Sequence, residues 1–286
     1  MGRGKAGGCR LSPLALVLSA GLASGGAWAA PAADALPSGG QVVAGQAGIG
    51  HSGNTLTVSQ GSDKAIIDWQ RFDIGRAAAV QFLQPSSSSV ALNRVLSGEA
   101  SQIYGSLTAN GKVYLVNPAG VVFGSGSKVD VGALVASTLD ISNEDFLAGR
   151  LVFSRAGSTG SITNAGEITA ADGGLVALLA PTVRNEGVIR ARLGTVALAA
   201  GDKVTLAAGA DGLLQVALEP STVQTLIENK QLIVADGGQV LMTSKAADAL
   251  SAGIVANSGT VQARTLAEKE GRILLLADMS HGEVKH

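Results

Sequence analysis

Residues 164–200 read NAGEITAADGGLVALLAPTVRNEGVIRARLGTVALAA, and one unit occurs twice within them. Each copy has an Asn-x-Gly turn, a short apolar strand, a turn containing glycine, and a second apolar strand. The two copies begin at Asn164 and Asn185, which are 21 residues apart. A repeat of that length, made of two or three short strands with turns between them, is the period of a solenoid.

The unit returns nearer the C-terminus. Asp236-Gly237-Gly238 precedes the apolar residues 239–243, Asn257-Ser258-Gly259 precedes 260–263, and Gly271 precedes 272–276. Stacked units would give every strand a parallel neighbour and would place aliphatic side chains over one another inside the coil. The predicted inward-facing residues are Val176, Leu178, Val196, Leu198, Val240, Ile273 and Leu275.

Two segments interrupt the repeat and have helical features. Val223, Leu226 and Ile227 have helical spacing behind a possible cap at Ser221 or Thr222. Residues 245–250 are mostly good helix formers. We expect both segments to form short helical excursions from the coil.

The composition favours a coil over a compact domain. The chain has 39 glycines, 46% hydrophobic residues and only 3% aromatic residues, so small and β-branched side chains must fill the core. A β-sandwich with glycine-rich turns is the alternative, but sandwich turns do not usually repeat as the same pair of motifs. The predicted fold class is therefore all-β, a right-handed parallel β-helix.

Upstream of the repeat, three apolar segments are typical of strands that cap the first open edge of a solenoid. They are Gln41–Val43, Thr55–Val58 and Ala65–Trp69. Ser142 with Asp145 has the spacing of a capping box and Gly149 suits the residue after a helix. Residues 143–148 are therefore predicted to form a single helical turn.

Residues 1–29 have the features of a secretory signal peptide. Arg3, Lys5 and Arg10 precede a short apolar run, and Ala27-Trp28-Ala29 resembles a cleavage site. Removal of this segment leaves 18 basic against 22 acidic residues, a net charge of −4, and removes the only cysteine. The exported domain would have no disulfide, no basic surface for nucleic acid and no transmembrane segment.

Residues 90–154 contain the most specific motifs. They include Asn93-Arg94-Val95, then Asn110-Gly111-Lys112 followed by Val113–Val116, then Asn117-Pro118-Ala119-Gly120, and finally residues 129–138. This ordered series strongly resembles the haemagglutination-activity, or two-partner-secretion, domain of filamentous haemagglutinin-like exoproteins. The likeness covers most of the chain from about Leu36.

The resemblance implies a parallel β-helix that is exported across the outer membrane by a dedicated partner transporter with periplasmic recognition domains. It also implies that Asn117-Pro118-Ala119-Gly120 belongs to the secretion motif, although Ala119 replaces the usual Asn. The second Asn-Pro motif of the family is not evident, which suggests a subfamily built around Asn93 and Arg94. Seen as a turn alone, Pro118 presets φ, Asn117 can bond its own backbone and Gly120 tolerates positive φ, so a mainly structural role stays open.

The sequence has no pattern typical of an enzyme. It lacks nucleotide-binding, nucleophile-elbow and zinc-protease motifs, and no cofactor is expected. Asp68 and Asp73 flank Trp69, but five-residue spacing would turn them to opposite faces of a strand. The Asp-Gly-Gly turns lack the tandem period of calcium-binding repeats, so ordinary turns are the better interpretation.

We therefore predict a signal peptide at 1–29, a two-partner-secretion domain at 30–160 and further β-helix repeats at 161–286, which end as if truncated. The predicted function is the N-terminal export module of a secreted adhesin at the surface of a Gram-negative bacterium, reached through the periplasm. The N-terminus of a contact-dependent growth-inhibition toxin and a β-helix carbohydrate-active enzyme are the alternatives. Any host-cell or carbohydrate ligand would bind downstream regions.

Overall fold

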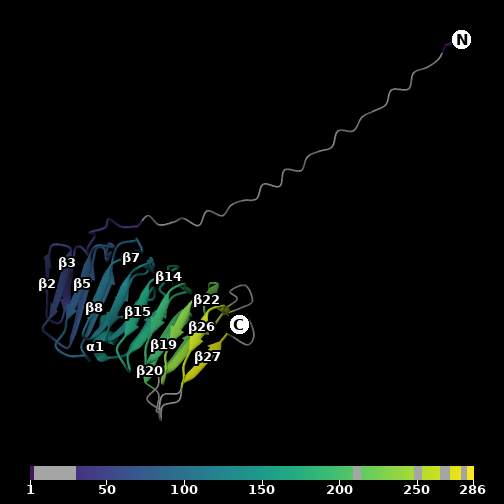
Figure 1. The fold of residues 1–286 in the computed structure, drawn as a ribbon. Coiled ribbons are helices and arrows are strands. Elements are labelled where there is room, and N and C mark those ends of the chain that lie inside the picture. The colour runs from purple at the N-terminus through teal and green to yellow at the C-terminus, as the bar shows by residue number, and fades with distance from the viewer. Residues whose placement is uncertain (3–29, 209–213, 248–252, 265–270, 278–281) are drawn as a thin grey trace.

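The computed structural model describes residues 1–2, 30–208, 214–247, 253–264, 271–277 and 282–286. Ala27 and Ala29, the predicted signal-cleavage residues, lie outside this range. The described residues coil into a parallel β-helix, with strands stacked from β2 at one end to β27 at the other (Figure 1). The predicted fold class is confirmed.

Three long sheets form the walls of the coil. Sheet I contains, in spatial order, β1 (Gln41–Ala44), β4 (Lys64–Trp69), β6 (Val90–Val95), β9 (Lys112–Val116), β12 (Ala133–Ser137), β16 (Leu175–Leu179), β19 (Thr195–Ala200), β24 (Gln239–Ser244) and β27 (Arg272–Leu276). Sheet II contains β7 (Ser101–Ile103), β10 (Val121–Phe123), β14 (Ser161–Asn164), β17 (Thr182–Asn185), β22 (Thr225–Asn229), β25 (Gly253–Asn257) and β28 (Gly282–Lys285).

Sheet III contains β2 (Ala47–Ser52), β3 (Thr55–Gln60), β5 (Ala79–Leu83), β8 (Ser106–Ala109), β11 (Lys128–Val131), β15 (Glu167–Ala170), β18 (Val188–Arg190), β23 (Leu232–Val234) and β26 (Thr260–Gln262). A fourth, antiparallel sheet lies outside the coil, and we call it the outer sheet. It contains β13 (Leu151–Ser154), β20 (Lys203–Ala208) and β21 (Leu214–Glu219).

From β5 onward, each turn of the coil contributes one strand to each of the three sheets, which explains the repeat. Asn164 pairs with Asn185 in sheet II and Ile168 pairs with Ile189 in sheet III, so corresponding residues are 21 positions apart. Identical or similar side chains therefore lie directly above one another.

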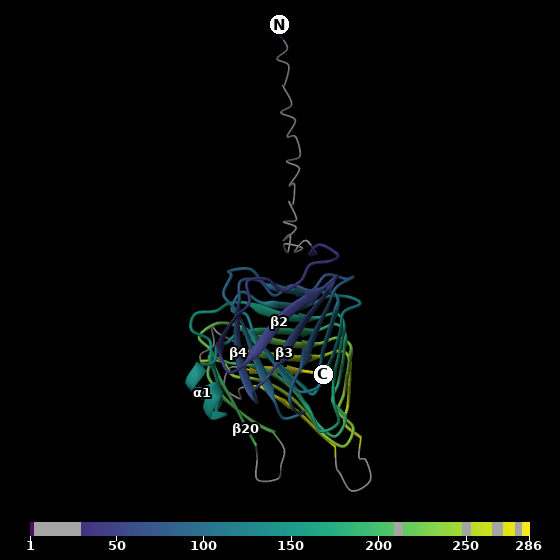
Figure 2. The same cartoon turned by 90° about the vertical axis from the view of Figure 1, so that its left-hand side faces the viewer.

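An antiparallel cap closes the first turn, as predicted. β1 pairs antiparallel with β4, and β2 pairs antiparallel with β3. Figure 2 shows β2, β3 and β4 at the near end of the coil. The structure refines the prediction, because β3 and β4 also pair in parallel with β5 and β6. They form the first turn of the coil, and only β1 and β2 are added to it.

The interior of the coil is a continuous aliphatic core. Five of the seven predicted core residues are completely buried: Val176, Leu178, Val196, Leu198 and Val240. Leu275 packs half-buried against this core. Ile273 pairs in register with the inward-facing Val240, as predicted, but it is 45% exposed because β27 is the last strand of sheet I among the described residues.

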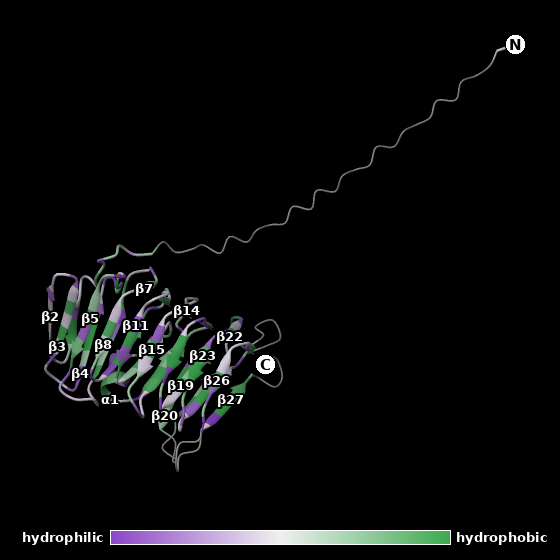
Figure 3. Cartoon of the chain, viewed as in Figure 1, coloured by the Kyte–Doolittle hydropathy of each residue, from purple (hydrophilic) through white to green (hydrophobic). Residues whose placement is uncertain are grey.

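A second apolar core lies outside the coil and was not predicted. Ile66, Leu92, Val135, Ala177 and Ala197 on the outer face of sheet I pack in one cluster with the outer sheet and with the segment before it. The members from those covering segments are Leu139, Ile141, Phe146, Phe153, Val204 and Leu206. The middle strands of sheet I, such as β12 and β19, are thus buried on both faces, and they are predominantly hydrophobic (Figure 3).

One predicted helix is present. α1 (Asn143–Ala148) begins after Ser142, whose hydroxyl accepts the Asp145 N–H at 3.0 Å. It ends at Gly149, whose φ of 78° is the left-handed conformation that glycine adopts without steric cost. Both predicted caps are confirmed.

The second helix prediction is wrong. Residues 225–229 form β22, in which Thr225, Ile227 and Asn229 face the interior in strict alternation. The apolar spacing of Val223, Leu226 and Ile227 was misleading. Leu226 is apolar but does not face the core; it lies half-buried on the outward face of β22. The third prediction fails where it can be tested, since Ala246 forms an isolated bridge with Ser221, and residues 248–250 lie outside the described residues.

Candidate functional site

Arg94 lies on the outer face of β6 and joins sheet I to the segment that leads into α1. Its guanidinium donates to Oδ1 of Asp140 at 3.0 Å, to the Ile141 carbonyl at 2.7 Å and to Oδ1 of Asn143 at 3.0 Å. It also forms an ion pair with Asp68 at 3.3 Å, and its side chain is only 14% exposed. Because several donors of the guanidinium are used, Arg94 is a rigid link between the coil and the second core.

Asn93 points to the opposite face, into the coil. The Trp69 indole N–H donates to Oδ1 of Asn93 at 3.0 Å, and Nδ2 of Asn93 donates to the carbonyls of Ala91 and Tyr114 at 3.3 Å. Trp69 packs edge-on against Phe72, with 5.5 Å between ring centres. Asn93 therefore orients the largest side chain near the cap.

Asn117 organises two turns and is fully buried. Nδ2 of Asn117 donates to the Glu99 carbonyl and to Oγ of Ser101, both at 3.0 Å, which holds the preceding turn of the coil. Its Oδ1 accepts the Ala119 N–H at 2.9 Å, which is the predicted side-chain turn bond. Gly120 closes the turn with a φ of 128°, a conformation open to glycine.

The two motifs lie next to each other, which the sequence could not reveal. Arg94 pairs with Val116 in the parallel register of β6 and β9, and Asn117 follows Val116 directly. Pro118 is exposed and Ala119 half-buried at this corner, beside the buried Asn117. Leu96, on the adjacent turn, is 56% exposed. The corner therefore offers a small apolar surface supported by buried asparagines.

The outer sheet is anchored at its base by Asp202. Arg155, directly after β13, donates to Asp202 at 2.6 Å, and the Thr222 hydroxyl donates to the same carboxylate at 2.8 Å. Burial acts to raise the pKa of Asp202, but the hydrogen bonds from Arg155, Thr222 and Ser221 outweigh it and lower that pKa below its usual value. These contacts join β13 to the β20–β21 hairpin.

A ladder of buried asparagines runs along sheet II. Nδ2 of Asn164 donates to Asn185 at 2.8 Å, Asn185 donates to Asn229 at 2.7 Å, and Asn229 donates to Asn257 at 2.7 Å. The next contact joins Asn257 to Nδ1 of His286 at 2.9 Å. Three of these asparagines were visible as Asn-x-Gly turns. Asn229 was missed because Gln231 replaces the glycine and the outer hairpin stretches this interval to 44 residues.

The acidic residues considered for catalysis have structural partners. Asp68 forms an ion pair with Arg94, and Asp73 accepts the Gln102 N–H at 2.8 Å. In the Asp-Gly-Gly turns, Asp172 pairs with Arg192, and Asp236 pairs with Arg264 at 3.1 Å. Across the described ranges, no cluster of His, Cys, Asp and Glu has the arrangement of a metal site.

The described part of the chain contains no helix with the length and apolar character needed to cross a membrane. Its organised features are instead a capped parallel β-helix, a sheet packed on its outer wall, and an asparagine-supported corner.

The chain belongs to the TPS secretion domain family, whose family model matches residues 33–285. It is 38% identical over 252 residues to a heme/hemopexin-binding protein of Haemophilus influenzae strain Rd, a match that covers 85% of this chain and 27% of that protein. A second heme/hemopexin-binding protein of Haemophilus influenzae is 34% identical over 246 residues, covering 78% of this chain and 26% of that protein. The chain thus spans about a quarter of the length of these curated relatives.

The fold resembles the crystal structure of the HMW1 secretion domain from Haemophilus influenzae. The TM-score is 0.67 at 31% sequence identity, and the match covers 80% of this chain and 65% of that one. The recognised family is therefore supported by both sequence and structure.

Proposed function

We propose that this chain is the export module of a secreted exoprotein and that a partner transporter in the outer membrane recognises it. The main support for this proposal is the family match over residues 33–285, which includes both the cap and the repeats. The proposed route begins with cleavage after Ala29, continues through the periplasm and ends outside a Gram-negative cell.

The recognition surface that we propose is the corner formed by Pro118 and Ala119 with the adjacent Leu96. It combines exposed apolar groups with a backbone held rigid by Asn117. Rigid presentation lowers the conformational entropy lost on binding. Asn93 and Arg94 act indirectly in this scheme, because their side chains hold Trp69 and the α1 segment in place.

An adhesin is the cargo that we propose for the complete exoprotein, with the host ligand bound outside this module. A growth-inhibition toxin would use the same export module and differ in its downstream domain. The sequence identity to heme/hemopexin-binding proteins is confined to about a quarter of their length. It therefore supports a common export route and does not support a common ligand. We propose no catalytic role, since the candidate carboxylates are engaged by arginines or backbone.

Export can be tested by expressing the chain in a Gram-negative host with and without the transporter encoded near it. Extracellular and periplasmic amounts are then measured from the same cultures. We expect extracellular protein only with the transporter, and periplasmic protein without it. An unrelated β-rich protein behind the same leader serves as control and should stay in the periplasm. Equal extracellular yield with and without the transporter would contradict the proposal.

A further inference from the structure

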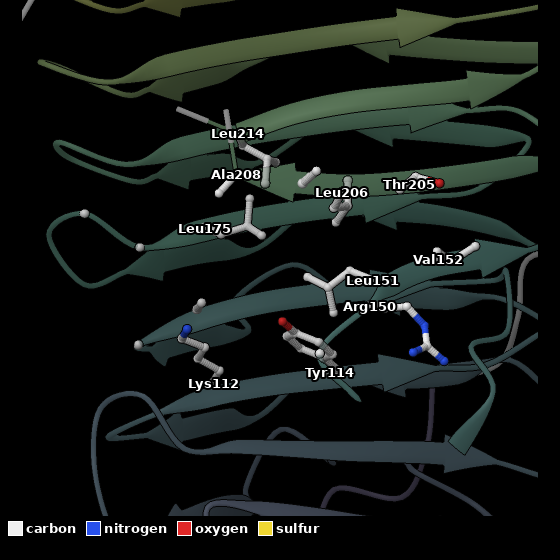
Figure 4. A pocket seen from close by; sticks show the side chains of 16 residues that line it. Lys112, Tyr114, Arg150, Leu151, Val152, Leu175, Thr205, Leu206, Ala208 and Leu214 are labelled. Atoms are coloured by element: carbon white, nitrogen blue, oxygen red, sulfur yellow. The ribbon is translucent and has the colours of Figure 1, made fainter. Parts of the chain in front are cut away.

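A cleft of about 710 Å³ lies between the outer face of sheet I and the outer sheet. Sheet I provides Tyr114, Ala133 and Leu175, and the covering segments provide the apolar side chains of Leu151, Val152, Leu206, Ala208 and Leu214. Figure 4 shows Tyr114 and Leu175 from sheet I, and Leu151, Leu206 and Leu214 from the outer sheet, around one space. The volume is within the usual range for small-ligand sites.

One polar group in this apolar cleft has no partner among the described residues. Tyr114 is only 5% exposed, yet its hydroxyl takes part in none of the hydrogen bonds found among the described residues, and Figure 4 shows its oxygen at the cleft. Burial raises the pKa of Tyr114 to about 12, so the phenol stays protonated and can donate a hydrogen bond. The ring of Tyr114 is buried, but its hydroxyl oxygen reaches the open space of the cleft, where a ligand can accept its hydrogen bond.

The described residues that line the cleft carry positive charges. Among the described residues that line it, the charged ones are Lys112 and Arg150. Arg150 is already paired with Glu144 and Asp145 at 2.9 and 2.7 Å. Lys112 has no such ion pair within the described residues, and its amine lies on the same side of the cleft as the Tyr114 oxygen in Figure 4. Lys112 and Tyr114 thus offer an ammonium and an O–H donor at one end of an apolar chamber.

We propose that this cleft binds a long-chain monocarboxylate, with its alkyl chain between Leu151, Leu175 and Leu206 and its carboxylate at Lys112 and Tyr114. A neutral apolar ligand would leave the ammonium and the hydroxyl unused, and a cationic amphiphile would be repelled by Lys112. A charge-assisted hydrogen bond to the ammonium accounts for about a tenfold preference for the acid over the alcohol of equal length.

Titration calorimetry of the exported chain with dodecanoate, dodecanol and dodecyltrimethylammonium tests this inference. We expect one dodecanoate per chain, dodecanol binding about tenfold more weakly, and no binding of the cation. Octanoate should bind at least tenfold more weakly than dodecanoate, because each buried methylene contributes roughly fourfold to affinity. Equal affinity for acid and alcohol would overturn the proposed head-group site.

Paired variants locate the site. Lys112→Met should weaken dodecanoate about tenfold and leave dodecanol unchanged, whereas Lys128→Met, on the exposed start of β11, should change neither. Ala208→Trp should fill the cleft and abolish binding. Ala217→Trp is its matched control, because Ala217 is exposed on the opposite face of the outer sheet. Binding that survives Ala208→Trp with the thermal unfolding curve unchanged would place the ligand elsewhere.

A lipid bilayer also contains acyl chains, so a last experiment tests whether the protein floats with phosphatidylglycerol vesicles. We expect no flotation. Vesicle binding without binding of free dodecanoate would overturn the assignment in favour of a membrane surface.

Discussion

The two halves of the coil are specialised by different side chains. Every phenylalanine and tyrosine precedes residue 155, and so does Trp69. Trp69, Phe72, Phe82 and Phe123 fill the first turns, where Asn93 and Asn117 each bond to a different set of neighbouring groups and belong to no ladder. The second half has an aliphatic core and one continuous asparagine ladder.

The two halves therefore differ in their structural roles: the first closes the end of the coil, and the second repeats one cross-section. Large side chains of unique shape fix one arrangement of the first turns beneath the cap. Repeated aliphatic stacks and a ladder instead define a cross-section that each further turn can adopt. At the far end, Ile273, Leu274 and Leu276 of β27 are 39–50% exposed, in contrast to the buried first turns. The first half, which contains the proposed secretion motif, therefore depends more on side chains of unique shape than the second half does.

The largest expected effect comes from charging the stacked core. Leu198 is completely buried and lies in register between Leu178 and Met242. Leu198→Asp should lower the free energy of unfolding by more than about 3 kcal/mol, because the carboxylate would be buried without a partner. Thermal unfolding measures the loss, and Gln81→Asp, on the exposed face of β5, is the control. A loss below about 0.5 kcal/mol, typical of a surface site, would reject the stacked core.

The asparagines of the two halves should differ in how strongly their contributions to stability are coupled. Asn185→Val should cost about 2 kcal/mol, because it leaves the donor of Asn164 and the acceptor of Asn229 unpaired. Adding Asn164→Val should then cost less than its own single effect, since the two residues share one bond. Asn93→Val with Asn185→Val should be additive. Chemical denaturation of the single and double variants gives these coupling energies, and additivity within the ladder would show that its members act separately.

At the proposed recognition corner, the effect of the buried Asn117 can be separated from that of the exposed Pro118. Replacing both Asn117 and Pro118 with Ala should lower export, with structural contributions of about 1 kcal/mol from the lost side-chain turn bond and from the lost preset φ. Pro118→Ala alone leaves the bonds of Asn117 intact, so it should reduce export with little change in thermal unfolding if the surface is recognised. Wild-type export of the double variant with unchanged folding would make the turn dispensable.

The smallest expected effect concerns the anchor of the outer sheet. The folded-state pKa of Asp202 lies below the usual 3.8, so its stabilisation is complete above about pH 4 and is lost as the pH falls through that lowered pKa. Asp202→Asn should cost at most about 1 kcal/mol near neutrality and should flatten stability below pH 4. Unfolding measured from pH 2 to 7 would show this, with Asp130→Asn on exposed β11 as control. An unchanged acid profile would contradict the anchor role.

The sequence predicted the coil because its repeat is local and regular. The spacing of Asn164 and Asn185 gave the turn length, and Ser142 with Gly149 located α1. The second core was missed, although the uninterrupted apolar run of Leu175–Leu179 is typical of a strand buried on both faces. The partners of that face, such as Phe153 and Leu206, come from separate insertions whose positions depend on long-range packing. For the same reason, the adjacency of Arg94 and Asn117 emerged only from the register.

Amide hydrogen exchange along the exported chain tests most directly whether a closed first half supports an open, repetitive second half. We expect the slowest exchange in β4, β6 and β9, a gradual decrease in protection along the ladder, and rapid exchange in β26, β27 and β28. Self-association, if present, should protect those last strands in a concentration-dependent manner. Uniform protection from β4 to β27 in a strictly monomeric sample would contradict the difference between the two halves.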